Sequence, residues 1–140
     1  MHEEWLDDPA IPNDEELYRR IPPLWYRRKD DGSFEVASGA FDNDSRGEPM
    51  SVYLGSLLRH HELEPADTIR GHPGFGVAVV TAGAVRTHQQ RVCKDPDPDP
   101  SRPHPCDPAH GLVAGSKNQK RKQRMRDAST LLIAPGTPSS

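Results

Sequence analysis

Short runs in which apolar and polar residues alternate are the dominant pattern along this chain, and they predict strands. A strand turns successive side chains to opposite faces, so alternation indicates a segment with one face in the core. Residues 50–54 are the clearest example, with Met50, Val52 and Leu54 expected inside and the two residues between them on the other face. Further strands are expected at residues 90–94, 109–114 and 130–134.

The most apolar run in the chain is Phe75–Ala82. Its length and its valines are typical of a strand buried on both faces, so we expect it at the centre of the sheet. Residues 14–21 leave two interpretations open. Residues 14–18 could open a short helix, because acidic residues favour a helix start, or residues 17–21 could form an edge strand with Leu17, Arg19 and Ile21 on one face.

A tight hairpin is predicted at Asp31-Gly32, because glycine accepts the positive φ that such a turn needs. The turn would pair residues 24–28 with residues 34–37. Trp25 is the largest apolar side chain in this half of the chain, and we expect it to anchor the core.

Four helical segments are expected, at residues 55–63, 65–70, 84–90 and 116–128. Ser116 and Gln119 fit the capping-box pattern at the start of the last one. Residues 95–107 alternate proline with aspartate, which removes backbone donors and predicts an exposed, extended loop. The strand, helix and strand within residues 109–134 suit a right-handed crossover if the two strands are parallel.

Together these elements predict an α+β fold, a single small domain with a mixed sheet, short helices and long proline-rich loops. Residues 1–14 are expected to form a flexible acidic lead-in, 15–134 the domain, and 135–140 a disordered tail. Only 33% of the residues are hydrophobic, and there are 15 prolines and 11 glycines. This composition predicts a core built from a few short strands.

The sequence also bears on location. No apolar run approaches the roughly 18 residues of a membrane helix, and the acidic start lacks the basic and apolar parts of a signal peptide. We therefore expect a cytoplasmic protein that does not enter a membrane. Its two cysteines, Cys93 and Cys106, are expected to be free thiols.

Charge is distributed unevenly along the chain. Residues 1–50 hold thirteen acidic and six basic side chains, whereas residues 109–140 hold one acidic and six basic side chains. The two ends either attract each other within the fold, or the basic end binds an anionic ligand, a nucleic acid or an acidic protein.

His110 is the candidate for proton transfer. It lies where the proline-rich loop meets a predicted strand, and glycines at positions 111 and 115 allow close approach of a ligand. A histidine there can donate or accept a proton near neutral pH. The alternative is a histidine that only hydrogen-bonds the loop.

The segment Gly115-Ser116-Lys117 at the predicted helix start resembles an anion cradle, since free backbone amides and the helix dipole favour negative charge there. The basic helix after it can bind phosphates without sequence preference, although it lacks aromatic residues for base stacking. The candidate ligand-binding residues are Ser116, Lys117, Lys120 and Arg121, with Arg19 and Arg20 as supporting charges.

Two parts of the chain carry side chains of the kind that bind metal ions. Cys93, His104, Cys106 and His110 offer four ligands of the kind that bind zinc, but their spacing is not that of paired structural ligands. The loop at residues 42–47 lacks the glycine and distal glutamate of a helix-loop-helix calcium site. We assign no metal and no cofactor.

Four motifs, LYRRIP, SGAFD, MSVYL and DPAHGLVAGSK, occur in this order across residues 15–134. In this order they resemble a group of small uncharacterised bacterial proteins without known activity, which implies a bacterial cytoplasmic origin. A weaker resemblance is to small ADP-ribosyltransferase toxins, with Arg19 or Arg20 and Ser51 or Tyr53 in the first two motif positions. The late glutamate of that family is missing, since none follows Glu64.

The leading functional hypothesis is an accessory or regulatory protein that binds an anionic partner through residues 110–126. The alternative is a small nucleotide-handling or hydrolytic enzyme with His110 as general acid or base. Both require the strand that carries His110 and the basic helix to open onto one shared hollow.

Overall fold

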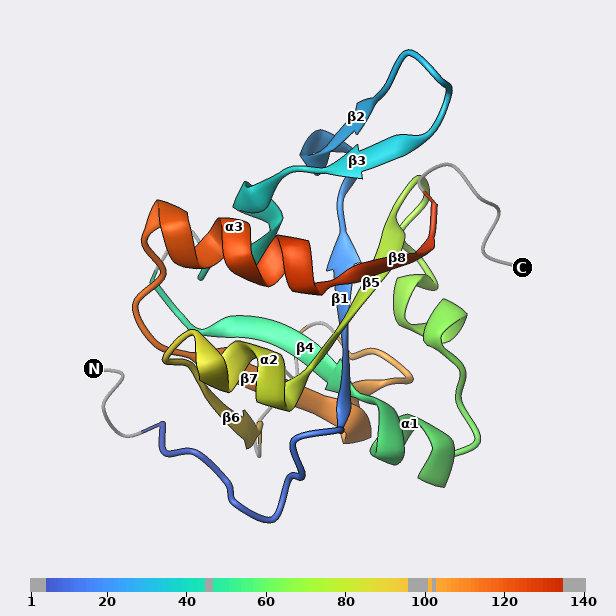
Figure 1. The fold of residues 1–140 in the computed structure, drawn as a ribbon. Coiled ribbons are helices and arrows are strands. Elements are labelled where there is room, and N and C mark those ends of the chain that lie inside the picture. Colours follow the sequence, from blue (N-terminus) through green and yellow to red (C-terminus); the bar gives the residue numbers. More distant parts are fainter. Residues whose placement is uncertain (1–4, 45–46, 96–100, 102, 135–140) are drawn as a thin grey trace.

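A computed structural model describes residues 5–44, 47–95, 101 and 103–134. Six strands form one sheet in the order β6-β7-β4-β1-β5-β8 (Figure 1). The bounds of these strands are β1 Glu16–Ile21, β4 Met50–Leu54, β5 Gly76–Thr81, β6 Arg91–Lys94, β7 His110–Ala114 and β8 Thr130–Ile133. The predicted α+β fold is confirmed, and the strands alternate in direction, so that the sheet is antiparallel throughout rather than mixed.

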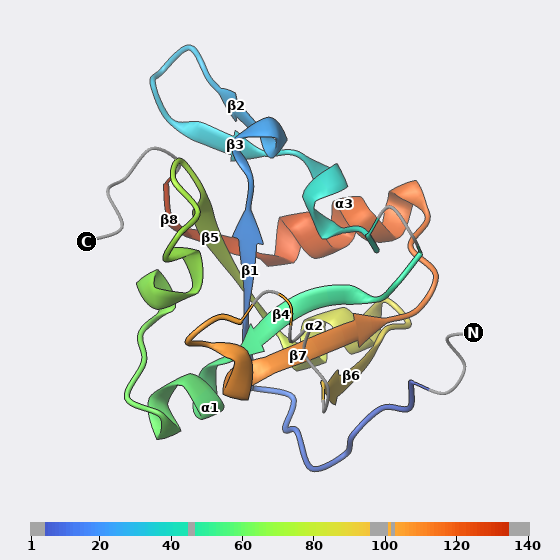
Figure 2. The ribbon, with the colours of Figure 1, turned by 180° about the vertical axis from the view of Figure 1, so that it is seen from behind.

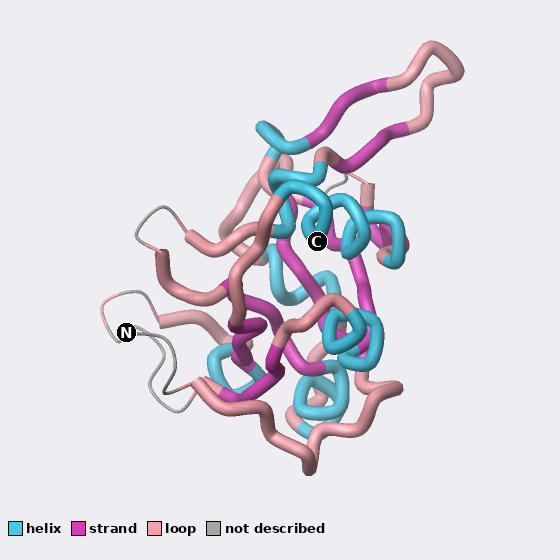
Figure 3. Tube along the Cα trace, turned by 60° about the vertical axis from the view of Figure 1, so that its left-hand side comes forward, coloured by secondary structure: helices cyan, strands magenta, loops and turns pink. Residues whose placement is uncertain are grey.

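Two further strands, β2 (Tyr26–Arg28) and β3 (Phe34–Val36), form the predicted hairpin. The hairpin extends away from the sheet, as Figure 3 shows. Gly32 at its turn has a φ of 86°, the conformation that the Asp-Gly pair predicted. Trp25 lies in a 3-10 turn just before the hairpin and is partly buried against the core.

Within the described residues, three helices and three more 3-10 turns pack around the sheet. The helices are α1 (Gly55–His60), α2 (Ala82–Thr87) and α3 (Gln119–Ala128). The turns are Ser38–Phe41, Pro65–Ile69 and Asp107–Ala109. None of the helices within the described ranges is long and apolar enough to cross a membrane.

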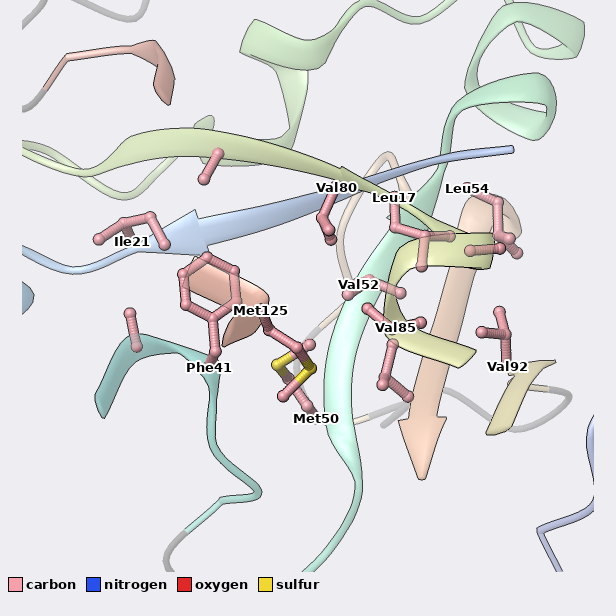
Figure 4. Packing of buried hydrophobic residues seen from close by; sticks show 14 of the residues in the cluster. Leu17, Ile21, Phe41, Met50, Val52, Leu54, Val80, Val85, Val92 and Met125 are labelled. Atoms are coloured by element: carbon pink, nitrogen blue, oxygen red, sulfur yellow. The ribbon is translucent and has the colours of Figure 1, made fainter. Parts of the chain in front are cut away.

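The sheet separates two hydrophobic clusters. On the face that we call the first, alternate residues of β1 and β4, including Leu17, Val52 and Leu54, pack with Phe41 and Met125 (Figure 4). Helices α2 and α3 cover this face, and α3 lies on the near side of the molecule in Figure 1 and on the far side in Figure 2. The opposite, second face carries a smaller cluster built on Tyr18, Tyr53 and Val77 and covered by α1 and the remaining turns. The inward positions predicted for Met50, Val52 and Leu54 are confirmed.

Two strand placements differ from expectation. Residues 17–21 form a strand with neighbours on both sides, β4 and β5, so neither the helix nor the edge strand is right. Strand β5 is flanked by β1 and β8 and therefore lies one place away from the middle pair of strands. Both differences arise because strand order depends on long-range pairing, which local hydrophobicity does not encode.

The last helix also begins later than predicted. Its first residue is Gln119, and Asn118 caps it by accepting a hydrogen bond from the Arg121 backbone N–H at 2.8 Å. Ser116 is therefore not the cap. The alternation of directions makes β7 and β8 run the same way, as a crossover requires, but three other strands separate them in the sheet.

Part of the predicted acidic lead-in packs against the fold. The Asp8 backbone N–H donates to the Val92 carbonyl at 2.8 Å, alongside β6, and Ile11 is only 4% exposed. Residues 1–4 and the predicted tail 135–140 lie outside the described residues, and so do 96–100 and 102 of the proline-rich loop.

Candidate functional site

A polar pocket of about 860 Å³ opens on the second face of the sheet. Three of its side chains come from neighbouring strands, because the strand register places them on that face: Arg20 of β1, Tyr53 of β4 and His110 of β7. Loops contribute His72, Asp95 and His104. The sheet and its loops thus bring the Arg20 guanidinium and three imidazoles together around the phenol ring of Tyr53. The pocket is also lined by Arg70 and by the carboxylates of Asp44, Glu48 and Asp107.

His110 is held by a carboxylate. Its Nδ1 lies 2.7 Å from Asp95 Oδ2, and the two side chains are only 14% and 12% exposed. The ring also packs edge-on against Tyr53, with centroids 5.5 Å apart. Because the carboxylate accepts a hydrogen bond from Nδ1–H, Nε2 is the ring nitrogen left to take up or release a proton. A histidine oriented in this way by a carboxylate is typical of a general base.

Arg20 is positioned by three contacts. Its Nη1 donates to His72 Nε2 at 2.7 Å and lies 3.5 Å from the Thr68 carbonyl oxygen, and its guanidinium carbon lies 5.3 Å from the centre of the Tyr53 ring. Within the described part of the chain no hydrogen bond uses its Nε or Nη2. The guanidinium is therefore fixed by one end and able to donate to an anion with the other.

The contact with Arg20 also fixes the state of His72. A guanidinium only donates, so His72 Nε2 must accept, and the ring is neutral with its proton on Nδ1. Burial lowers the pKa of His72, and the Arg20 charge lowers that pKa further. His72 is thus a neutral positioning residue for Arg20.

His104 has a structural role. Its Nδ1 accepts from the Cys106 backbone N–H at 3.1 Å, which leaves the proton on Nε2, 3.1 Å from the Arg70 carbonyl oxygen. Both ring nitrogens are therefore occupied in the neutral form, and burial lowers the pKa of His104. Of the three imidazoles in the pocket, His110 is the one arranged for proton transfer.

Tyr53 forms the floor on which these groups rest. Its side chain is almost fully buried, and burial raises its pKa, so the phenol keeps its proton. The ring contacts Arg20, His110 and His104. Such a platform fixes the positions of the charged groups at little cost in conformational freedom.

The other predicted supporting arginine, Arg19, lies on the first face. Adjacent residues of a strand point to opposite sides, so Arg19 and Arg20 separate. Arg19 Nε donates to the Ala40 carbonyl and Nη1 donates to the Ser51 carbonyl, each at 2.9 Å, and burial lowers the pKa of Arg19 to about 10. It joins the Ser38–Phe41 turn to β4.

Lys117 is also bound to its own chain. Its Nζ donates to the Val113 carbonyl at 2.8 Å, to the Gly115 carbonyl at 3.1 Å and to the Asn43 side-chain oxygen. Three acceptors match the three donors of an ammonium group, while burial lowers the pKa of Lys117 to about 7. No donor of Lys117 is left for an anion in this arrangement.

The predicted anion cradle does not lie at a helix start, because α3 begins at Gln119. The Ser116 carbonyl and hydroxyl oxygens accept from Arg121, which also contacts Gln89. Lys120 is exposed on α3. None of these residues lines the pocket, so His110 and Arg20 are brought together while Arg19, Ser116, Lys117, Lys120 and Arg121 are not. The expectation that the strand of His110 and the basic helix open onto one shared hollow is therefore wrong, and His110 shares its pocket with Arg20 instead.

Metal-ligating side chains do not converge either. In the described ranges no group of three or more histidine, cysteine or acidic side chains is placed to hold one metal ion. Cys93 and Cys106 are buried free thiols, as predicted. Burial raises the pKa of Cys106 to about 11, which keeps it in the unreactive thiol form.

Acidification is expected to destabilise the fold through His72 and His104. Both pKa values lie below the ordinary imidazole value, so near pH 6 the folded chain binds fewer protons than the unfolded chain. The free energy of unfolding should therefore fall as the pH drops through about 6.5. Urea denaturation between about pH 7.5 and about pH 5 measures this slope. His72→Gln should reduce this slope. His60→Gln is the control, since His60 is exposed on α1, and it should leave the slope unchanged. Equal slopes in the unsubstituted protein and both variants would contradict the role of His72 in the pH dependence.

The four motifs on which the sequence resemblance rests lie on β1, the Ser38–Phe41 turn, β4 and β7 with the segment after it. Arg20 lies on β1, Tyr53 lies on β4 and His110 lies at the start of β7. No known protein family, curated protein or solved structure matches this chain, so that resemblance stays a prediction and the pocket geometry carries the functional argument.

Proposed function

We propose that the protein is a small enzyme acting on a phosphate-bearing substrate, with His110 as general acid and base and Arg20 as the phosphate-binding cation. One observation carries this proposal: the Asp95–His110 pair and the guanidinium fixed by His72 open into the same pocket. A carboxylate-oriented histidine beside a preorganised arginine is an arrangement suited to phosphoryl chemistry.

Hydrolysis of a phosphate ester would use His110 twice, first as base and then as acid, and Asp95 and Arg20 as supports for the charges that develop. His110 Nε2 takes a proton from the attacking water as its oxygen bonds to phosphorus, and the Asp95 carboxylate stabilises the imidazolium that forms. The ester P–O bond breaks, and the imidazolium returns the proton to the leaving oxygen. Arg20 donates to the phosphoryl oxygens, where negative charge accumulates. General acid–base catalysis of this kind is worth roughly 100- to 10,000-fold in rate.

The accessory-protein hypothesis has weaker support. Lys120 and Arg124 are exposed on α3 and remain able to meet an anionic partner. However, Lys117 and Arg121 donate to their own chain, and Lys122 Nζ lies 3.2 Å from Asp42. Much of the predicted cationic surface is thus neutralised or occupied within the fold. A cytoplasmic setting remains part of our proposal, and the two free thiols support it.

Substituting Arg20 tests the proposal. Arg20→Gln removes the charged donor, so we expect KM for a phosphate ester to rise by roughly 10- to 100-fold, the worth of one or two charge-assisted hydrogen bonds. Initial rates with p-nitrophenyl phosphate and bis(p-nitrophenyl) phosphate measure this change. Arg59→Gln is the matched control, since Arg59 is a 65% exposed arginine on α1. Absence of turnover by the unsubstituted protein, or an unchanged KM in Arg20→Gln, would overturn the proposal.

A further inference from the structure

Trp5 lines the same pocket as Arg20 and His110. Its side chain is partly buried, yet within the described residues it packs against neither hydrophobic cluster of the sheet. Trp25, by contrast, packs against the cluster on the first face. An indole at a pocket wall that adds little to the core is available to contact a ligand.

The segment that carries Trp5 is fixed immediately after it. The Asp7 carboxylate accepts from the Val92 backbone N–H at 2.9 Å and from Arg86 Nε at 3.0 Å. Arg86 Nη2 donates to the Asp8 carbonyl at 3.0 Å, and the Asp8 N–H donates to the Val92 carbonyl at 2.8 Å. Four hydrogen bonds thus hold residues 7 and 8 along β6. The indole therefore starts from an anchored backbone, which lowers the entropic cost of using it to bind a ligand.

The same strand also places the proton-transfer pair. Strand β6 runs from Arg91 to Lys94, and Asp95, which orients His110, follows at once. Val92 at the start of β6 fixes the segment of Trp5, and the end of β6 presents Asp95. One strand thus fixes both the wall of the pocket and its acid–base pair.

We infer that Trp5 is a stacking surface for the base of a nucleotide, which makes nucleoside phosphates the substrate class of the site. This inference rests on the proposed function, since it takes Arg20 as the phosphate ligand. A pocket of about 860 Å³ is within the range that holds small-molecule ligands of nucleotide size. The indole supplies a flat face for the base, and the guanidinium supplies donors for the phosphate.

Calorimetric titration with three ligands tests the inference: adenosine 5′-monophosphate, ribose 5-phosphate and inorganic phosphate. Base stacking on an aromatic side chain is worth roughly 5- to 150-fold in affinity, so the nucleotide should bind at least about 5-fold more tightly than ribose 5-phosphate. Trp5→Ala should remove this difference and leave the affinity for ribose 5-phosphate unchanged. Trp5→Phe should restore most of it, because a phenyl ring also stacks. Leu6→Ala, at the neighbouring 71% exposed position, is the matched control and should change neither affinity.

The outcomes separate the two proposals. Equal affinities for the nucleotide and ribose 5-phosphate in the unsubstituted protein would overturn the role of Trp5 and leave the phosphate site intact. So would a Trp5→Ala protein that keeps the preference, or one that loses affinity for both ligands equally. Failure of all three ligands to bind would overturn the phosphate site itself. Binding of the nucleotide should also change the fluorescence of Trp5 in a Trp25→Phe protein, in which Trp5 is the single tryptophan.

Discussion

Replacing His110 by alanine is expected to lower the turnover of a phosphate ester by roughly 100- to 10,000-fold, while the affinity for inorganic phosphate changes little. The proposed role of His110 is to move a proton, and the phosphate is held by Arg20. The loss should therefore appear in kcat rather than in KM. Initial rates with bis(p-nitrophenyl) phosphate and calorimetric titration with inorganic phosphate measure the two effects separately.

The control for this experiment distinguishes catalysis from folding. His60→Ala changes an exposed histidine on α1 and should leave kcat at the unsubstituted value. Asp95→Asn should lower kcat less than His110→Ala, because the imidazole stays in place but loses the carboxylate that stabilises its charged form. A purely structural His110 would give the opposite pattern, in which His110→Ala lowers the urea midpoint and leaves turnover per folded molecule unchanged.

Local sequence patterns predicted much of the fold. Alternation in residues 50–54 placed Met50, Val52 and Leu54 correctly in the core, because the two-residue period of a strand fixes which side chains share a face. The Asp31-Gly32 pair identified the hairpin between β2 and β3 for an equally local reason. Features of this kind depend on residues close together in the sequence, so the sequence alone predicts them.

Strand order and the position of the helix cap were harder to predict from the sequence. Residues 17–21 looked like a helix or an edge strand, although they form an interior strand with Arg19 on one face and Arg20 on the other. Both arginines were predicted as supporting charges, but Arg20 lines the pocket and Arg19 points to the opposite face of the sheet. Ser116 fitted the pattern of a helix start, but the Asn118 side chain accepts from the Arg121 backbone N–H and caps the helix instead.

Two residues of the candidate site, His110 and Arg20, were predictable from the sequence, and the residues that position them were not. His110 was identified from its place between a proline-rich loop and a strand. Asp95, which orients it, is 15 positions away, and His72, which positions Arg20, is 52 positions from that arginine. Pairs so distant in sequence are brought together by the antiparallel sheet and its loops, and no local spacing signals them. Trp5 escaped notice for the same reason, since its segment lies beside β6 in space and far from it in the chain.

Phe41→Ala is expected to lower the free energy of unfolding by about 3–5 kcal/mol. Phe41 ends the Ser38–Phe41 turn, is fully buried, and lies beside Met125 of α3 in the cluster on the first face (Figure 4). Removing the ring leaves a cavity between α3 and the sheet, and the Arg19 hydrogen bond that ties the turn to β1 limits how far the turn can collapse into it. Urea denaturation followed by circular dichroism measures the loss. Leu24→Ala is the control, because Leu24 is 79% exposed and its substitution should change stability by less than about 0.5 kcal/mol.

The pocket lies on the other face of the sheet, so the folded fraction of Phe41→Ala should keep its affinity for inorganic phosphate. A loss of phosphate binding in a protein that is still folded would mean that the two faces are coupled through β1, the strand that carries Arg19 toward one and Arg20 toward the other.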